Sequence, residues 1–235
     1  MTHLEHELAR LKNEVKEMGT LVESQLKKSI QAFTKVDKDL ARQIIFQDRR
    51  VNAEELKIDR DCENIMALFN PVAIDLRLVF AAFKINSHLE RIGDHAKGIA
   101  RYALELNEPY QQKLLDDFNL MKMYELVDSM ITVNINAFEQ ANTTEARTIF
   151  RKDLTIDELN RQATVKIGSY IKENTENTAA LLSLVFVIKK LECIGDLNTN
   201  IAEEVIFFVE ANVLKHEKEK LRTCRQQLIF HQHSA

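Results

Sequence analysis

The chain has 235 residues and a formal net charge of −4, with 45% hydrophobic and 29% charged residues. This balance is typical of a globular protein with one large domain or two small ones, and it lacks the basic excess that usually marks nucleic-acid binding. Five glycines and two prolines are few for this length, and strands need turns rich in both residues. The composition therefore predicts long helices in an all-α fold.

We expect a cytoplasmic protein. The longest apolar run, residues 179–188, is about half of the roughly 20 residues that a bilayer span requires. Charged residues within the first dozen positions leave no apolar core for a signal peptide. The cysteines are odd in number and lack metal-type spacing, which suits a reducing interior.

The first half of the chain has the apolar spacing of three helices. Asp37 is placed to cap the second of them, and Asn70-Pro71 provides an N-cap and a first-turn proline for the third. We predict these helices at residues 4–35, 37–69 and 72–106.

The second half repeats this pattern after Pro109, with helices predicted at residues 114–140, 143–173 and 177–211. Short connections make sequential helices antiparallel neighbours. We therefore predict two tandem antiparallel three-helix bundles related by an internal repeat. The expected domains are residues 1–108 and 109–213, followed by a charged tail at residues 214–235.

One motif occurs in the last helix of each half. Leu-Glu-Arg-Ile-Gly-Asp-His-Ala-Lys-Gly-Ile-Ala begins at Leu89, and Leu-Glu-Cys-Ile-Gly-Asp-Leu-Asn-Thr-Asn-Ile-Ala begins at Leu191. The copies are 102 residues apart and agree at seven of twelve positions. Chance rarely reproduces a polar pair, a glycine and an apolar frame together, so the copies indicate a long-period repeat.

Each copy carries a row of oxygen-bearing side chains. Glu90 and Asp94 are four residues apart and share one helix face, as do Glu192 and Asp196, and Asn200 continues the second row. The apolar residues of each motif lie on the opposite side of the helix. We therefore expect both rows on an outer face of the protein and not in its core.

The preceding helix of each half carries a matching pair, Asp48 with Asn52 and Asp153 with Asp157. Adjacent helices could bring each pair close to an acidic row. A solvated helix face is the ordinary explanation of such residues, but their recurrence in both halves favours metal binding. Carboxylate and amide oxygens suit Mg²⁺, Ca²⁺, Mn²⁺ or oxidised iron.

Gly93 and Gly195 stand beside the acidic rows, where a helix interior disfavours glycine. They indicate either close approach of a neighbouring helix, which we favour slightly, or room for a ligand. His88 and His95 flank the first row and are better explained by packing than by metal ligation. We expect Cys193 to be an ordinary buried or half-buried thiol.

These motifs, together with Pro-x-x-x-Asp-Leu-Arg at residues 71–77 and the opening helix at residues 8–23, resemble the PhoU family of phosphate-uptake regulators. The resemblance extends to about residue 211. It implies two similar three-helix bundles, a homodimer and a cytoplasmic location. It also implies a non-enzymatic negative regulator of the phosphate-starvation response, which couples a Pst phosphate ABC transporter to a phosphate-sensing histidine kinase and modulates phosphate uptake.

The resemblance further implies multinuclear metal sites on the acidic motifs. Carried over by position, their ligands are Asp48, Asn52, Glu90 and Asp94 in the first half, and Asp153, Asp157, Glu192, Asp196 and Asn200 in the second. This sequence departs from the family pattern at Cys193, where arginine is usual, and at Gly98, where asparagine is frequent. The segment at residues 71–77 also has no counterpart in the second half. The second ligand set is the more complete.

Two alternatives stay open from the residues alone. One is a carboxylate-bridged metalloenzyme on a helical bundle, and the other is a metal-storage or purely structural scaffold. Di-iron bundle enzymes use Glu-x-x-His directed into the core, and this chain contains no such motif. It also lacks a Gly-rich phosphate loop and a zinc signature, so the enzyme interpretation is the weaker one.

Overall fold

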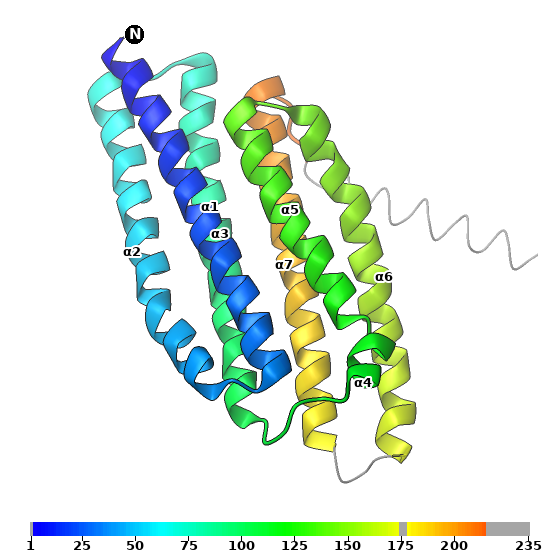
Figure 1. Ribbon diagram of the computed structural model, residues 1–235. Coiled ribbons are helices and arrows are strands. Elements are labelled where there is room, and N and C mark those ends of the chain that lie inside the picture. The colour runs from blue at the N-terminus through cyan, green and yellow to red at the C-terminus, as the bar shows by residue number, and fades with distance from the viewer. Residues whose placement is uncertain (1, 174–177, 215–235) are drawn as a thin grey trace, which may run out of the picture.

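The computed structural model describes residues 2–173 and 178–214. Within these ranges the chain forms seven helices and no strand (Figure 1). The helices are α1 (His3–Lys35), α2 (Lys38–Phe69), α3 (Ala73–Glu105), α4 (Gln112–Asp117), α5 (Leu120–Gln140), α6 (Thr143–Glu173) and α7 (Thr178–Glu210).

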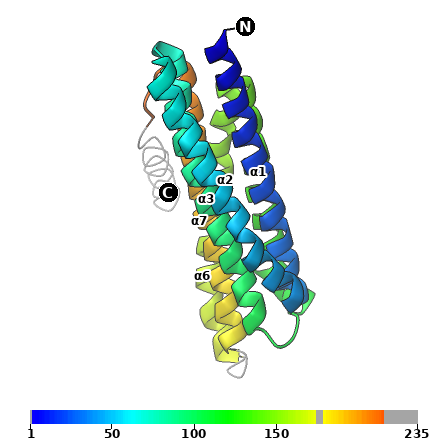
Figure 2. The same cartoon turned by 90° about the vertical axis from the view of Figure 1, so that its left-hand side faces the viewer.

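The helices form two bundles that lie side by side. Helices α1, α2 and α3 pack together as one, and α5, α6 and α7 as the other, with the short α4 ahead of α5. The bundles join where α3 packs against α7 and α1 against α5, which leaves α2 and α6 on the two outer sides (Figure 1). The helices run along the long axis of an elongated molecule (Figure 2). The predicted all-α fold with two three-helix bundles is confirmed.

The apolar frame of each motif copy faces the core, as the helical spacing predicts. In α3 the side chains of Leu89, Ile92, Ala96 and Ile99 are fully buried. Their counterparts in α7 are buried as well. The two copies therefore anchor the two central helices of the molecule.

Contacts between the bundles are both apolar and polar. A Cβ on Gly19 of α1 would lie 2.5 Å from Cδ1 of Ile135 in α5, so glycine allows this close approach. Across the other seam, Nε of Arg77 donates to the backbone carbonyl of Phe208 at 3.1 Å. The last carbonyls of a helix have no partner within the helix, so Arg77 caps the end of α7.

Two local predictions are wrong. Asn70 ends α2 in a left-handed conformation with φ 47°, which asparagine tolerates better than most residues, and does not cap α3. Helix α3 begins at Ala73 with Val72 as its N-cap, so Pro71 precedes the helix and is not in its first turn. The helix predicted at residues 114–140 is broken between α4 and α5. Asn119 has φ 53° there, and the buried ring of Phe118 packs edge-on against Tyr170. Of the predicted tail, residues 215–235 lie outside the described residues, and the predicted domain boundaries stay predictions.

Replacing Leu89 with alanine should lower the free energy of unfolding by about 2–5 kcal/mol, because Leu89 is fully buried in the central helix α3. The matched control is Leu56→Ala in α2, where the leucine is 64% exposed and the change should stay within about 0.5 kcal/mol. Chemical denaturation followed by circular dichroism measures both. Equal losses in the two variants would contradict this assignment of the core.

Candidate metal centre

The second half gathers three carboxylates between α6 and α7. Asp153 and Asp157 lie one turn apart on α6, and Asp196 faces them from α7. A ligand oxygen from each lies within 4.8 Å of the other two. In the part of the chain that the structure describes, these residues form the only such group of three among the His, Cys, Asp and Glu side chains. The structure therefore brings together three of the five side chains predicted for this site.

Gly195 makes room for this arrangement. A Cβ at this position would lie 2.9 Å from Oδ1 of Asp153 and 3.3 Å from Cδ1 of Ile156. The glycine thus lets α6 approach α7 closely and places the carboxylate of Asp153 against the α7 backbone. The predicted close approach of the neighbouring helix is confirmed, and in this half the same glycine also accommodates a candidate ligand.

The other two predicted residues of the second half are not members of this group. Glu192 is buried, and its Oε2 accepts hydrogen bonds from Nζ of Lys189 at 2.6 Å and from Sγ of Cys193 at 3.5 Å. Asn200 is half-buried one turn beyond Asp196. Burial and the neighbouring Glu192 carboxylate raise the pKa of the half-buried Cys193 thiol, so the thiol stays protonated at neutral pH.

In the first half, a lysine and a glutamine bind the buried carboxylate of Asp48. Nζ of Lys97 lies 2.6 Å from Oδ2 of Asp48 and 2.6 Å from Oδ1 of Asp94, bridging α2 and α3. The amide of Gln25 in α1 donates to Oδ1 of Asp48 at 3.0 Å and to the carbonyl of Gly93 at 3.3 Å. Burial disfavours the Lys97 ammonium, but its hydrogen bonds to the two carboxylates prevail and raise the pKa of Lys97.

The remaining residues predicted for the first site lie around this bridge. Glu90 is half-buried, and burial followed by repulsion from Asp94, Glu55 and Asp48 raises its pKa. Asn52 is exposed on α2, as Asp94 is on α3. Two of the four predicted ligands of this half, Asp48 and Asp94, are therefore bound by a lysine.

The two histidines of the first motif are in environments that favour the neutral imidazole. Burial, together with the positive charges of Arg91 and Lys84, lowers the pKa of His88 to about 4. Burial and the charge of Lys190 likewise lower the pKa of His95. Neither belongs to the close group of carboxylates, in keeping with the packing interpretation.

The expectation that the acidic rows face outward is wrong for Glu192, and Asp48 and Asp153 on the preceding helices are buried as well. Asp48, Asp153 and Glu192 are only 4%, 0% and 8% exposed. The polar face of a helix points away from its own apolar stripe, but in a bundle a neighbouring helix can cover that face. Sequence reasoning also missed Lys97 and Gln25. Lys97 lies three residues after Asp94 and could have been identified as its partner, whereas Gln25 comes from a helix with no motif.

The second group fits a hard cation. Oxygens bound to one Mg²⁺ or Ca²⁺ at roughly 2.0–2.6 Å are at most about 5 Å apart, and the three carboxylate oxygens lie within 4.8 Å of one another. The donors are carboxylate oxygens, as such ions prefer. At the first site the Lys97 ammonium lies between two of the four predicted ligands. The residues present there do not fit a metal ion.

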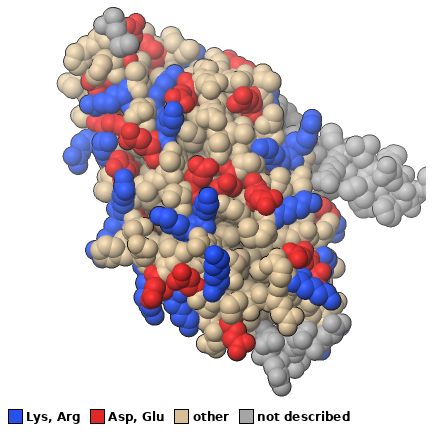
Figure 3. Space-filling model, in the orientation of Figure 1, with Lys and Arg blue, Asp and Glu red and all other residues tan. Residues whose placement is uncertain are grey.

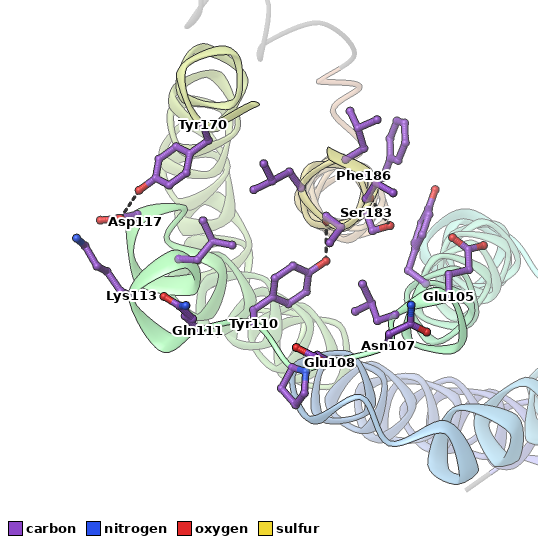
Figure 4. A pocket seen from close by; sticks show the side chains of 18 residues that line it. Glu105, Asn107, Glu108, Tyr110, Gln111, Lys113, Asp117, Tyr170, Ser183 and Phe186 are labelled. Carbon is purple, nitrogen blue, oxygen red and sulfur yellow. Dashed lines mark hydrogen bonds between the residues drawn. The ribbon is translucent and has the colours of Figure 1, made fainter. Parts of the chain in front are cut away.

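Other surface features lie apart from these carboxylates. A hollow of about 980 Å³ lies at the end of the molecule where the α3–α4 connection passes α7 (Figure 4). There the hydroxyl of Tyr110 donates to the carbonyl of Ala180 at 2.7 Å, and Tyr170 donates to Asp117. None of the predicted site residues lines it. The face shown in Figure 3 has intermixed positive and negative groups, without a continuous field of one sign.

None of the described helices is both long enough and apolar enough to span a membrane.

Comparison with known proteins identifies a domain in both halves. The model of the PhoU domain matches residues 15–103 and 120–205. Phosphate-specific transport system accessory protein PhoU of Edwardsiella tarda is 35% identical over 210 residues, covering 89% of this chain and 86% of that protein. The homolog from Aquifex aeolicus is 35% identical over 216 residues, covering 91% of this chain and 97% of that protein.

Solved structures show the same architecture. The crystal structure of PhoU from Pseudomonas aeruginosa has a TM-score of 0.83 at 30% identity, covering 89% of this chain and 100% of that one. The phosphate transport system regulatory protein PhoU from Streptococcus pneumoniae has a TM-score of 0.82 at 28% identity, covering 91% and 100%.

Replacing Gly195 with alanine should destabilise the protein, because the new Cβ would displace the Asp153 carboxylate. Gly168 is the matched control: it also lies in a helix interior, and a Cβ there would meet nothing within 4 Å. We expect Gly168→Ala to stabilise by about 0.4–1 kcal/mol. Gly195→Ala should fall about 1–3 kcal/mol below that variant in denaturant unfolding. Equal stability of the two variants would contradict the close approach at Gly195.

Proposed function

The chain belongs to the PhoU family, and from this membership we propose that it is an accessory protein that regulates a phosphate transport system. The observation that carries the proposal is the PhoU domain in both halves together with relatives that match nearly the full length of this chain. Those relatives are named as accessory or regulatory proteins and not as enzymes. The proposed role is therefore exerted through contacts with other proteins.

In finer detail, we propose a cytoplasmic negative regulator of the phosphate-starvation response. It would contact a Pst phosphate ABC transporter from the cytoplasmic side and a phosphate-sensing histidine kinase, and it would act as a homodimer. Such contacts need accessible apolar surface. Helices α3 and α7 expose several aromatic side chains, among them Phe80, Phe83 and Phe186. These side chains support a role in protein contact and offer starting points for mapping the partners.

We also propose that the second bundle binds a hard cation through Asp153, Asp157 and Asp196. An ion there would supply positive charge that links α6 to α7. The buried carboxylate of Asp153 lies in the space left by the missing side chain of Gly195. The partly exposed carboxylates of Asp157 and Asp196 lie beside it. The proposed metal role is therefore to stabilise one pair of helices and not to carry out a reaction.

Deleting this gene in its source organism should raise alkaline phosphatase, or another phosphate-starvation output, while phosphate is abundant. The reason is that a repressive link between transporter and kinase would be lost. A plasmid copy of the unaltered gene should restore low output, and an empty plasmid is the control. Output that stays low after deletion would contradict negative regulation and favour the scaffold interpretation.

Removing two of the three carboxylates should abolish the response to metal. In the full chain freed of metal by chelation, Mn²⁺ should stabilise the native state by about 2.7 kcal/mol at a hundredfold excess over its Kd. The double variant Asp157→Asn with Asp196→Asn should show no rise in melting temperature, whereas the unaltered chain should. Asp39→Asn with Asp116→Asn removes the same charge at exposed positions and serves as the control. A rise that persists in the first double variant would contradict this site.

A further inference from the structure

We propose that Lys97 closes the first acidic row to metal ions, so that this chain binds its cation in the second bundle alone. The inference rests on the metal site of the proposed function. It adds that the two halves, although built alike, differ: a lysine bridges the acidic residues of the first half, and the acidic residues of the second half bind the ion. It follows from the contacts of Lys97 and Lys190 and from the residues that stand in the second half at the positions of Lys97 and Gly98.

The ammonium of Lys97 occupies the position that an ion would need. Its Nζ is 2.6 Å from one oxygen of Asp48 on α2 and 2.6 Å from one oxygen of Asp94 on α3, which are two of the four predicted ligands. The lysine side chain is 19% exposed, and Asp48 is almost fully buried. The second oxygen of Asp48 accepts from the amide of Gln25 at 3.0 Å. Both oxygens of the buried carboxylate are therefore bound by protein donors.

A tethered ammonium competes strongly with a free ion at such a place. Hydrogen bonds between charged partners are short and strong, and Lys97 makes two of them without losing the entropy of a separate molecule. A cation that binds both carboxylates must displace Nζ, since ion–oxygen distances of roughly 2.0–2.6 Å require nearly the same location. The displaced lysine would remain attached to α3 nearby and would repel the ion.

A second lysine covers the adjacent position of the row. Gly98 stands where the repeat places Asn200 in the second half. A Cβ on Gly98 would lie 2.6 Å from Nζ and 2.7 Å from Cε of Lys190, so the end of this α7 side chain lies directly over the glycine. At the position of Gly98 the first row therefore has no amide side chain, and the ammonium of Lys190 lies there instead.

The second half differs from the first at the repeat position of Lys97. The repeat places Thr199 where Lys97 stands, and its hydroxyl donates to the backbone carbonyl of Asp196 at 2.7 Å. This short neutral side chain is bound to its own helix. Lys189, on the preceding turns of α7, is paired with Glu192 at 2.6 Å. The same fold thus has an internal cation in one half and three gathered carboxylates in the other.

The consequence is an unequal response of the two bundles. The link between α2 and α3 is made by the Lys97 side chain, which belongs to the chain itself, so it is present at any ion concentration. The link between α6 and α7 would strengthen further when the proposed ion binds. Helix α3 packs against α7. A structural change in α7 on ion binding would therefore act on a helix whose own acidic residues are already held by Lys97.

The test places Lys97→Met in the full chain that already carries Asp157→Asn and Asp196→Asn, so that the second site is removed. Mn²⁺ binding is measured by titration calorimetry and by the change in melting temperature. Lys97→Arg keeps the positive charge, and Lys122→Met removes a charge from an exposed lysine on α5. We expect no Mn²⁺ binding in the background or with either control change, and binding with a rise in melting temperature once Lys97→Met is added.

Two outcomes would overturn the inference: Mn²⁺ binding to the background with Lys97 intact, or no binding after Lys97→Met. If Lys97→Met unfolds the chain, added Mn²⁺ should restore the helical circular-dichroism signal, and failure to restore it would count against the inference. Lys97→Gln provides a milder second variant with the same expectation. The proposed second site is tested separately with the unaltered chain. If Mn²⁺ does not raise the melting temperature of the unaltered chain, the second site is refuted, while the comparison of Lys97 variants still tests the first row.

Discussion

Each half of this protein depends on one close contact between its second and third helices. A Cβ at Gly93 would lie 3.1 Å from a methyl group of Val51, and a Cβ at Gly195 would lie 2.9 Å from the Asp153 carboxylate. Glycine is costly inside a helix, so its presence at both positions reflects how tightly the helices approach. That approach buries Asp48 and Asp153, and a buried carboxylate has to be compensated by charge or hydrogen bonds.

The two halves differ in the side chains that surround the buried carboxylate. The first provides Lys97 and the amide of Gln25, both of which are part of the folded chain. In the second, two further carboxylates lie within 4.8 Å of the buried one, and the proposed hard cation would offset their combined negative charge. A repeated fold can therefore keep the positions of its acidic residues and still place different side chains beside them, such as Lys97 in the first half and Thr199 in the second.

Membership of the PhoU family links this arrangement to regulation of phosphate transport. Helices α3 and α7 matter to the proposed function for two reasons. They carry the two motif copies, and their packing against each other joins the bundles. Arg77 and Lys84 of α3 reach across that seam to the carbonyl of Phe208 and to Glu204 on α7. A partner bound to the exposed aromatic residues of these helices would contact the same elements that hold both acidic rows.

The sequence by itself determined the all-α class, the internal repeat, the apolar stripes and the positions of the acidic residues, because helical periodicity is local and each motif shows it within a dozen residues. It also placed the Asp37 cap, whose side chain accepts from the backbone N–H of Leu40. Only the tertiary structure decided which acids are buried, where the fourth predicted helix breaks, and which ligands meet. These depend on neighbouring helices: Asp153 lies within reach of Asp196 because α6 packs on α7, and Asp48 meets Gln25 because α1 covers it.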